Sequence, residues 1–206
     1  MKFKFCILLI ISFTISAGKY NTIINIGESM PEFTNLPAIN GYSLSSKDLT
    51  EDVVVLVLLA NHCPWVRGMD QDLIKLVDSV KNKSVRVVGF SVNHREDDRL
   101  EAMQTHAKKV GYNFSYVFDE SQDLGRKLGA TRTPEYFVFD KARKLQYMGL
   151  LYNSPAKMNN DSSVRHINGE VTENYVFDAI MSLLSDNKVV VPETRAHGCS
   201  AKYEQE

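Results

Sequence analysis

The sequence predicts an α/β fold with a central, largely parallel sheet flanked by helices. Residues 53–60, "VVVLVLLA", form an unbroken apolar run, which is typical of a strand buried on both faces. Segments with helical spacing of apolar residues then alternate with further short apolar runs. The chain has 206 residues, 44% of them hydrophobic and 24% charged, as expected for one globular domain. Strands that alternate with helices favour a parallel sheet.

The remaining elements follow in order along the chain. Residues 32–44 are expected to form a small N-terminal hairpin around proline and glycine. After the strand at 53–60, the sequence predicts a helix over 64–82, a strand over 85–92 and a helix that ends at Gly111. A strand over 115–119 and a short helix through Leu128 follow. Two strands, 135–140 and 145–150, then form a late antiparallel hairpin. This hairpin makes the predicted sheet mixed.

Two capping residues and two irregular segments complete the prediction. Asp119, followed three residues later by Gln122, resembles a capping box for the short helix. Thr172 is the predicted cap of a final helix with Val176, Ile180, Leu183 and Leu184 on its inner face. The polar stretch 153–171 is predicted to be a surface loop. Residues 187–206 show no periodicity and are expected to form a C-terminal tail.

The N-terminus has the layout of a secretory signal peptide. Lys2 and Lys4 precede an apolar stretch over 5–15, and small residues follow at 16–18. The stretch is short for a membrane span of about 20 residues, although an uncleaved anchor is the alternative. We therefore assign 1–18 to the signal and 19–206 to one domain, exported to the periplasm or secreted. No later segment is long and apolar enough to cross a membrane.

Charge and composition exclude several classes of partner. The net charge of −1 gives no electrostatic reason to bind nucleic acid or an anionic membrane. Adjacent carboxylates such as Asp97 and Asp98 are interpreted as helix-start and surface charge, not as an acid–base pair. The sequence predicts no cofactor.

Signal removal leaves two cysteines, Cys63 and Cys199, in a compartment where disulfides persist. Cys63 falls where the first buried strand meets the first helix, and Pro64 suits the first helical turn. Sites in α/β sheets form at the carboxyl ends of strands. A helix N-terminus favours the thiolate, and a protonated His62 would act in the same direction. The alternative is that Cys63 is a small buried apolar residue.

Three segments together resemble a known family: "VVVLVLLANHCPWV" at 53–66, "VFDESQDLGRKLGATRTPEYFVFD" at 117–140 and "VPETRAHGCSAKY" at 191–203. They are similar to the thioredoxin-like redoxins of the alkyl hydroperoxide reductase/thiol-specific antioxidant superfamily. The nearest pattern is a peroxiredoxin-like branch with a Cys-Asn-His-Cys-Pro motif after the first core strand. The resemblance spans nearly all of residues 25–203 and implies a thioredoxin-like fold.

The resemblance also implies roles for individual residues. Cys63 matches the second cysteine of the motif, and Cys199 matches the cysteine of a Gly-Cys-Ser tail. Pro134 matches the cis-proline that faces the redox cysteines, so the backbone of Thr133 is expected to pair with an extended substrate. Trp65 is expected to pack beside the site, where it is a candidate for substrate contact.

The sequence departs from this family pattern in three places. Ala60 occupies the position of the first cysteine, which is usually the exposed nucleophile. Without that cysteine, no disulfide can form within the 60–63 loop. The Pro-x-x-x-Thr-x-x-Cys signature of true peroxiredoxins is absent, and "GLLYN" replaces an expected Arg-Ile-Asp-Asp-like segment after the late hairpin.

Three functional hypotheses remain open. In the first, Cys63 works with Cys199, 199 − 63 = 136 residues away, as a redox pair or a structural staple. In the second, Cys63 alone attacks a peroxide or a disulfide and is resolved by a thiol from outside, so the expected partners are a protein disulfide, a peroxide or a small thiol substrate, together with an external thiol reductant. In the third, the chain is a redox-inactive module that binds extended peptides, or a metal through His62, Cys63, His197 and Cys199.

Overall fold

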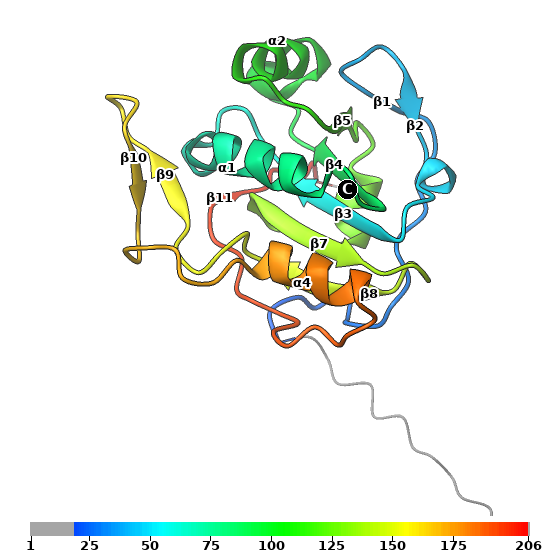
Figure 1. Ribbon diagram of the computed structural model, residues 1–206. Coiled ribbons are helices and arrows are strands. Elements are labelled where there is room, and N and C mark those ends of the chain that lie inside the picture. Colours follow the sequence, from blue (N-terminus) through cyan, green and yellow to red (C-terminus); the bar gives the residue numbers. More distant parts are fainter. Residues whose placement is uncertain (1–18, 206) are drawn as a thin grey trace, which may run out of the picture.

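The computed structural model describes residues 19–205, so the predicted signal peptide lies outside the described residues. A five-stranded mixed sheet in the order β5-β4-β3-β7-β8 forms its centre (Figure 1). Strand β3 pairs in parallel with β4 and antiparallel with β7, while β4 and β5 are parallel and β7 and β8 antiparallel. The strands are β3 (Val53–Leu58), β4 (Val85–Ser91), β5 (Ser115–Phe118), β7 (Glu135–Phe139) and β8 (Leu145–Gly149). The predicted α/β fold with a mixed sheet is confirmed.

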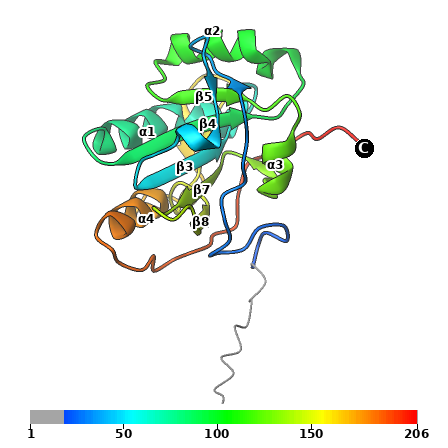
Figure 2. The ribbon, with the colours of Figure 1, turned by 90° about the vertical axis from the view of Figure 1, so that its right-hand side faces the viewer.

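Helices cover both faces of this sheet, as Figure 2 shows. Alternate residues of β3 enter two separate apolar clusters, because successive side chains of a strand point to opposite faces. Helices α1 (Pro64–Val80) and α4 (Tyr175–Leu184) contribute to one cluster, and α2 (Leu100–Val110) adds Met103 to it. The short helix α3 (Asp123–Lys127) packs on the other face through Leu124. Both faces of β3 are therefore buried, which explains its apolar run.

Two small hairpins extend from this core. The predicted N-terminal hairpin is present as β1 (Leu36–Pro37) and β2 (Ser43–Leu44). A second hairpin, β9 (Ala156–Met158) with β10 (Val164–His166), forms where the sequence predicts a surface loop, so that prediction is wrong. A Cβ atom on Gly68 of α1 would lie 2.8 Å from the Ala156 carbonyl oxygen. The missing side chain allows β9 to approach the helix backbone, and the polar sequence of the loop gives no sign of this.

Both predicted helix caps are wrong. Gln122, not Asp119, precedes α3, and its φ is 64°. The Asp119 carboxylate accepts a hydrogen bond from Gly125 N–H (3.0 Å), but the Gln122 side chain donates to the Val92 carbonyl (2.7 Å) instead of returning to Asp119. Helix α4 begins after Asn174, whereas the Thr172 hydroxyl accepts a hydrogen bond from the Asn153 side chain.

The C-terminal segment passes α3 and ends outside the core (Figure 2). Although it lacks periodicity, it contains strand β11 (Cys199–Ser200), which pairs antiparallel with β6 (Arg132–Thr133). In Figure 1 this segment passes beside the start of α1. None of the helices within residues 19–205 has the length and apolar character needed to span a membrane.

Candidate redox site

Cys63 lies at the junction of β3 and α1, as predicted. The chain leaves β3, turns with a hydrogen bond from Cys63 N–H to the Ala60 carbonyl (3.1 Å), and enters the helix at Pro64. Cys63 is the N-cap residue, and its own carbonyl accepts the first helical hydrogen bond, from Arg67. The side chain is completely buried, and its thiol donates to the Thr133 carbonyl oxygen at 3.1 Å.

Cys199, from the C-terminal segment, lies beside the same residue, Thr133. In the β6–β11 ladder Cys199 is the direct partner of Thr133, the residue that accepts the Cys63 hydrogen bond. The two thiols are neighbours, and both are free. The structure therefore brings together the two cysteines that the first hypothesis requires.

The neighbourhood keeps the Cys199 thiol protonated. Burial and, to a smaller extent, the adjacent Cys63 thiol together raise the pKa of Cys199 to about 12. Cys199 nevertheless keeps part of its surface exposed, whereas Cys63 has none. The partly exposed thiol of Cys199 therefore keeps its proton near neutral pH.

This raised pKa predicts slow alkylation of native Cys199. At pH 8 we expect iodoacetamide to modify it about a thousandfold more slowly than in urea-unfolded protein, because only the thiolate reacts. Site-resolved mass spectrometry measures both rates. In the Cys63→Ser variant the rate at Cys199 should rise, because one cause of its raised pKa is gone. Equal rates in native and unfolded wild type would contradict the prediction.

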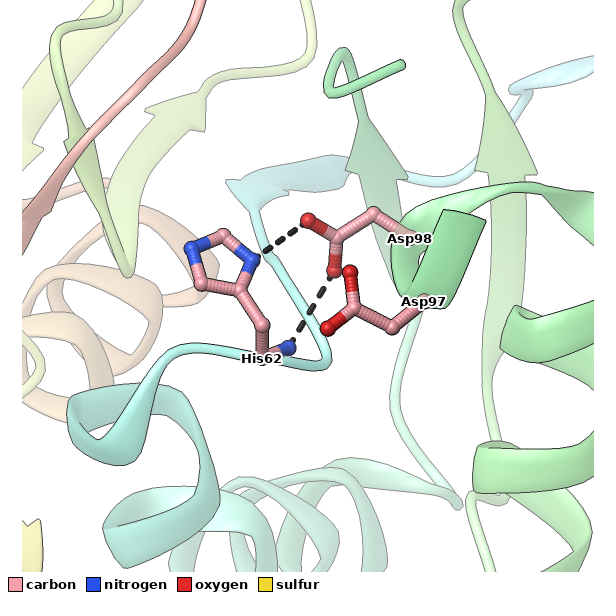
Figure 3. Close-up of side chains that lie close together, drawn as sticks. All are labelled: His62, Asp97 and Asp98. Atoms are coloured by element: carbon pink, nitrogen blue, oxygen red, sulfur yellow. Dashed lines mark hydrogen bonds and ion pairs between the residues drawn. The ribbon is translucent and has the colours of Figure 1, made fainter. Parts of the chain in front are cut away.

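His62 forms a part-buried hydrogen bond with Asp98 that the sequence analysis missed (Figure 3). Its Nδ1 lies 2.5 Å from Asp98 Oδ2, and its backbone N–H donates to Asp98 Oδ1 at 3.2 Å. Asp98 is fully buried, so its interpretation as surface charge is wrong, although Asp97 is exposed. Asn61 also donates to the Asp97 carbonyl (2.8 Å). Hydrogen bonds to the 3₁₀ turn at 96–98 thus fix the loop before Cys63. Figure 3 shows that the other ring nitrogen of His62 points away from both carboxylates.

Within residues 19–205, only one group of three or more side chains has donor atoms close enough to hold a metal ion, and it consists of His62, Asp97 and Asp98. Donor atoms of His62, Asp97 and Asp98 lie within 4.8 Å of one another. Each is already engaged: His62 pairs with Asp98, and the Arg95 guanidinium forms hydrogen bonds to both Asp97 oxygens and lowers the pKa of that carboxyl. We interpret the group as an ion-pair network. Neither cysteine belongs to it, so the hypothesised metal site with two cysteine ligands is not assembled.

The remaining predicted site residues lie around the cysteine pair. The Thr133–Pro134 peptide bond is cis, as the resemblance implies. The Thr133 edge, expected to pair with substrate, is occupied by Cys199 of the same chain. Trp65 packs beside the site, with its ring centroid 4.4 Å from that of His197 in an edge-on arrangement. Lys157 places its ammonium 5.6 Å from the Trp65 ring centroid.

A mixed sheet with a cysteine at the start of α1 and a cis-proline bond beside it defines a thioredoxin-like fold. The family model that matches this chain, described as Redoxin, covers residues 25–165, and the chain belongs to that family. Membership supports a thioredoxin-like redox function. No curated protein matches the chain.

Solved structures agree with this fold. An uncharacterized conserved protein from Geobacillus kaustophilus is 28% identical, with 90% of this chain and 96% of that chain covered and a TM-score of 0.77. A hypothetical protein from Sinorhizobium meliloti is 24% identical, with 89% and 97% covered and a TM-score of 0.78. The thioredoxin domain of a thiol-disulfide oxidoreductase from Bacteroides vulgatus is 21% identical, with 62% and 89% covered and a TM-score of 0.54.

Proposed function

We propose that the protein is an exported thiol-dependent oxidoreductase in which Cys63 and Cys199 form the redox pair. One observation carries the proposal: both cysteines meet at Thr133, one through its thiol and the other through the strand ladder. The signal-like pattern of residues 1–18 supports export, and in an oxidising compartment a disulfide between the two cysteines would persist until a reductant acts on it.

Two observations support an order of reaction for the two thiols. Cys63 lies at the N-terminus of α1, where the helix dipole stabilises an anion, and the raised pKa of Cys199 disfavours Cys199 as the first attacking group. In the proposed order, Cys63 attacks first. Its thiolate attacks one sulfur of a substrate disulfide, and the other substrate sulfur leaves as a thiolate and takes up a proton. Cys199 then loses its proton and attacks Cys63. The second substrate thiol leaves, and the Cys63–Cys199 disulfide remains. An external thiol reductant returns two electrons and two protons.

A peroxide can be reduced by the same pair. The Cys63 thiolate attacks one peroxide oxygen and becomes a sulfenic acid, while the other oxygen leaves as an alcohol or water. The Cys199 thiol condenses with the sulfenic acid, releases water and forms the same disulfide. We therefore expect the pair to accept disulfides, peroxides or both.

Activity assays with single cysteine variants test this proposal. We expect turnover of a disulfide or peroxide substrate by wild type and none by Cys63→Ser. The Cys199→Ser variant should react once and, with a disulfide substrate, accumulate a mixed disulfide at Cys63, visible by mass spectrometry. The matched control is Ser200→Ala, which changes the neighbour of Cys199 without removing a thiol. Wild-type activity in both cysteine variants would overturn the proposal.

A redox-inactive module that binds extended peptides is the second candidate. It is favoured by the complete burial of Cys63 together with the loss of a cysteine at position 60. This candidate predicts no turnover by wild type and no accumulation of a mixed disulfide in Cys199→Ser. The same assays therefore separate the two functions.

A further inference from the structure

The C-terminal segment 198–205 is bound along β6, beside α3, by contacts with its own domain, and we call the surface that it covers the groove. Its strand β11 pairs with β6, and Ala201 N–H continues the contact by donating to the Thr131 carbonyl (2.9 Å). The Thr133 backbone is where an outside chain is expected to pair. The segment therefore lies where a substrate would lie, and it leaves that edge filled.

One position in the groove admits only glycine. A Cβ atom on Gly198 would stand 2.1 Å from the Thr133 carbonyl oxygen, far inside any real contact. The φ of Gly198 is 155°, which residues with a side chain rarely adopt. A chain that presents a cysteine opposite Thr133 in this register therefore needs glycine immediately before it.

A second position accepts an aromatic side chain with a hydroxyl group. The Tyr203 hydroxyl donates to the Ala130 carbonyl (2.6 Å), and its ring lies under the Arg126 guanidinium, 5.0 Å away. A Cβ atom on Gly125 would stand 2.7 Å from the Tyr203 hydroxyl oxygen, so the absence of a side chain on α3 makes room for the ring. The tyrosine thus fits a formed subsite four residues after the cysteine.

Polar side chains bind the backbone between and beyond these positions. Asn93 accepts a hydrogen bond from Lys202 N–H at 3.0 Å. The Gln122 amide donates to the Lys202 carbonyl (3.0 Å) and accepts from Glu204 N–H (2.8 Å). Asn93 and Gln122 are both buried, although they come from separate loops. Contacts to peptide backbone do not depend on the tail's own side chains, so another chain can make them.

We propose that residues 198–205 are a resident ligand of a polypeptide-binding groove, and that the groove accepts outside segments of the same pattern. The pattern is glycine, then cysteine opposite Thr133, then tyrosine four residues later, in an extended conformation. The proposal rests on the proposed redox function because it names the substrate class of that site. It also requires the tail to leave before a substrate reaches Cys63.

The tethered tail is a strong competitor for this groove. A segment linked to its site acts at an effective concentration on the order of millimolar. Only molecules whose groove is empty can bind an outside peptide. The apparent affinity for the peptide is therefore the intrinsic affinity multiplied by the fraction of such molecules. Weakening the tail should raise the apparent affinity for the peptide.

A thiol-free binding experiment tests this inference on the full chain. The probe is a fluorescent synthetic peptide with the sequence of residues 195–205 and serine in place of the cysteine. The proteins carry Cys63→Ser and Cys199→Ser, with or without Tyr203→Ala in the tail. We expect Tyr203→Ala to tighten probe binding at least tenfold in fluorescence anisotropy, because its own tail loses the aromatic subsite. Gly198→Val, which blocks the tail at Thr133, is a second variant with the same expected gain.

Matched probes identify the subsites. A probe with valine in place of its glycine, or alanine in place of its tyrosine, should lose binding to both loosened variants. The inference would be overturned if the unchanged probe bound the Tyr203→Ala and Gly198→Val proteins no more tightly than the protein with an intact tail. Undiminished binding of the valine probe would overturn it as well. The probe lacks a thiol, so its binding does not depend on redox activity. Binding without turnover would refute the redox function alone, and turnover without binding would refute the groove alone.

Discussion

Oxidation of the protein is expected to raise its free energy of unfolding by about 5 kcal/mol. The Cys63–Cys199 disulfide would close a loop between positions 199 − 63 = 136 residues apart, and loss of unfolded-state entropy gives about this value in the chain-entropy model. The structure supports formation of this link, because strand pairing holds Cys199 opposite Thr133 and the Cys63 thiol contacts the same residue. Urea unfolding of oxidised and reduced protein measures the difference.

Single cysteine variants supply the control for this measurement. Cys199→Ser should unfold at the same urea concentration under oxidising and reducing conditions, because it cannot form the link. The reduced wild type should match this variant to within about 1 kcal/mol, since the substitution exchanges one small partly buried group for another. If oxidised and reduced wild type unfold alike although mass spectrometry shows the disulfide, the link is strained and this expectation fails.

The sequence predicts those parts of the fold that depend on local pattern. Strand β3 is recognisable because each of its residues is apolar, and each is buried between two clusters. The Asp119–Gln122 pair shows where local pattern misleads. Its spacing fits a capping box, but the Gln122 amide donates instead to the Val92 and Lys202 carbonyls, which are distant in the sequence. Tertiary contacts decide the conformation there, and no local spacing encodes them.

Some residues of the candidate site can likewise be identified from the sequence, and others cannot. Cys63 and Pro134 are identified by their positions next to a strand and by resemblance to the family. Asp98 is not, because an acidic run before a helix is usually solvated and only the packing of the 96–98 turn against the loop buries this one. The approach of Cys199 to Cys63 depends on how the 199 − 63 − 1 = 135 intervening residues fold, and the tail has no periodic pattern that would predict a strand.

Replacing Ala60 with cysteine is expected to move the disulfide from Cys63–Cys199 to positions 60 and 63. The turn already brings the two positions together, since Cys63 N–H donates to the Ala60 carbonyl. The new thiol would be tethered by only two intervening residues, so its effective concentration at Cys63 should exceed that of Cys199 on the tail. Peptide mapping of oxidised Ala60→Cys measures the partition, and free Cys199 should become the main alkylated residue.

This change should also reduce the stability gained on oxidation. Closing a four-residue loop contributes about 2 kcal/mol in the chain-entropy model, against about 5 kcal/mol for the long loop. Ala60 is completely buried, so the added sulfur must displace neighbouring atoms, and Ala60→Ser provides a control of similar size without redox chemistry. Continued pairing of Cys63 with Cys199 in most Ala60→Cys molecules would contradict the prediction. It would mean that the tail, rather than the turn, determines the partner of Cys63, and that burial at position 60 leaves no room for a competing thiol.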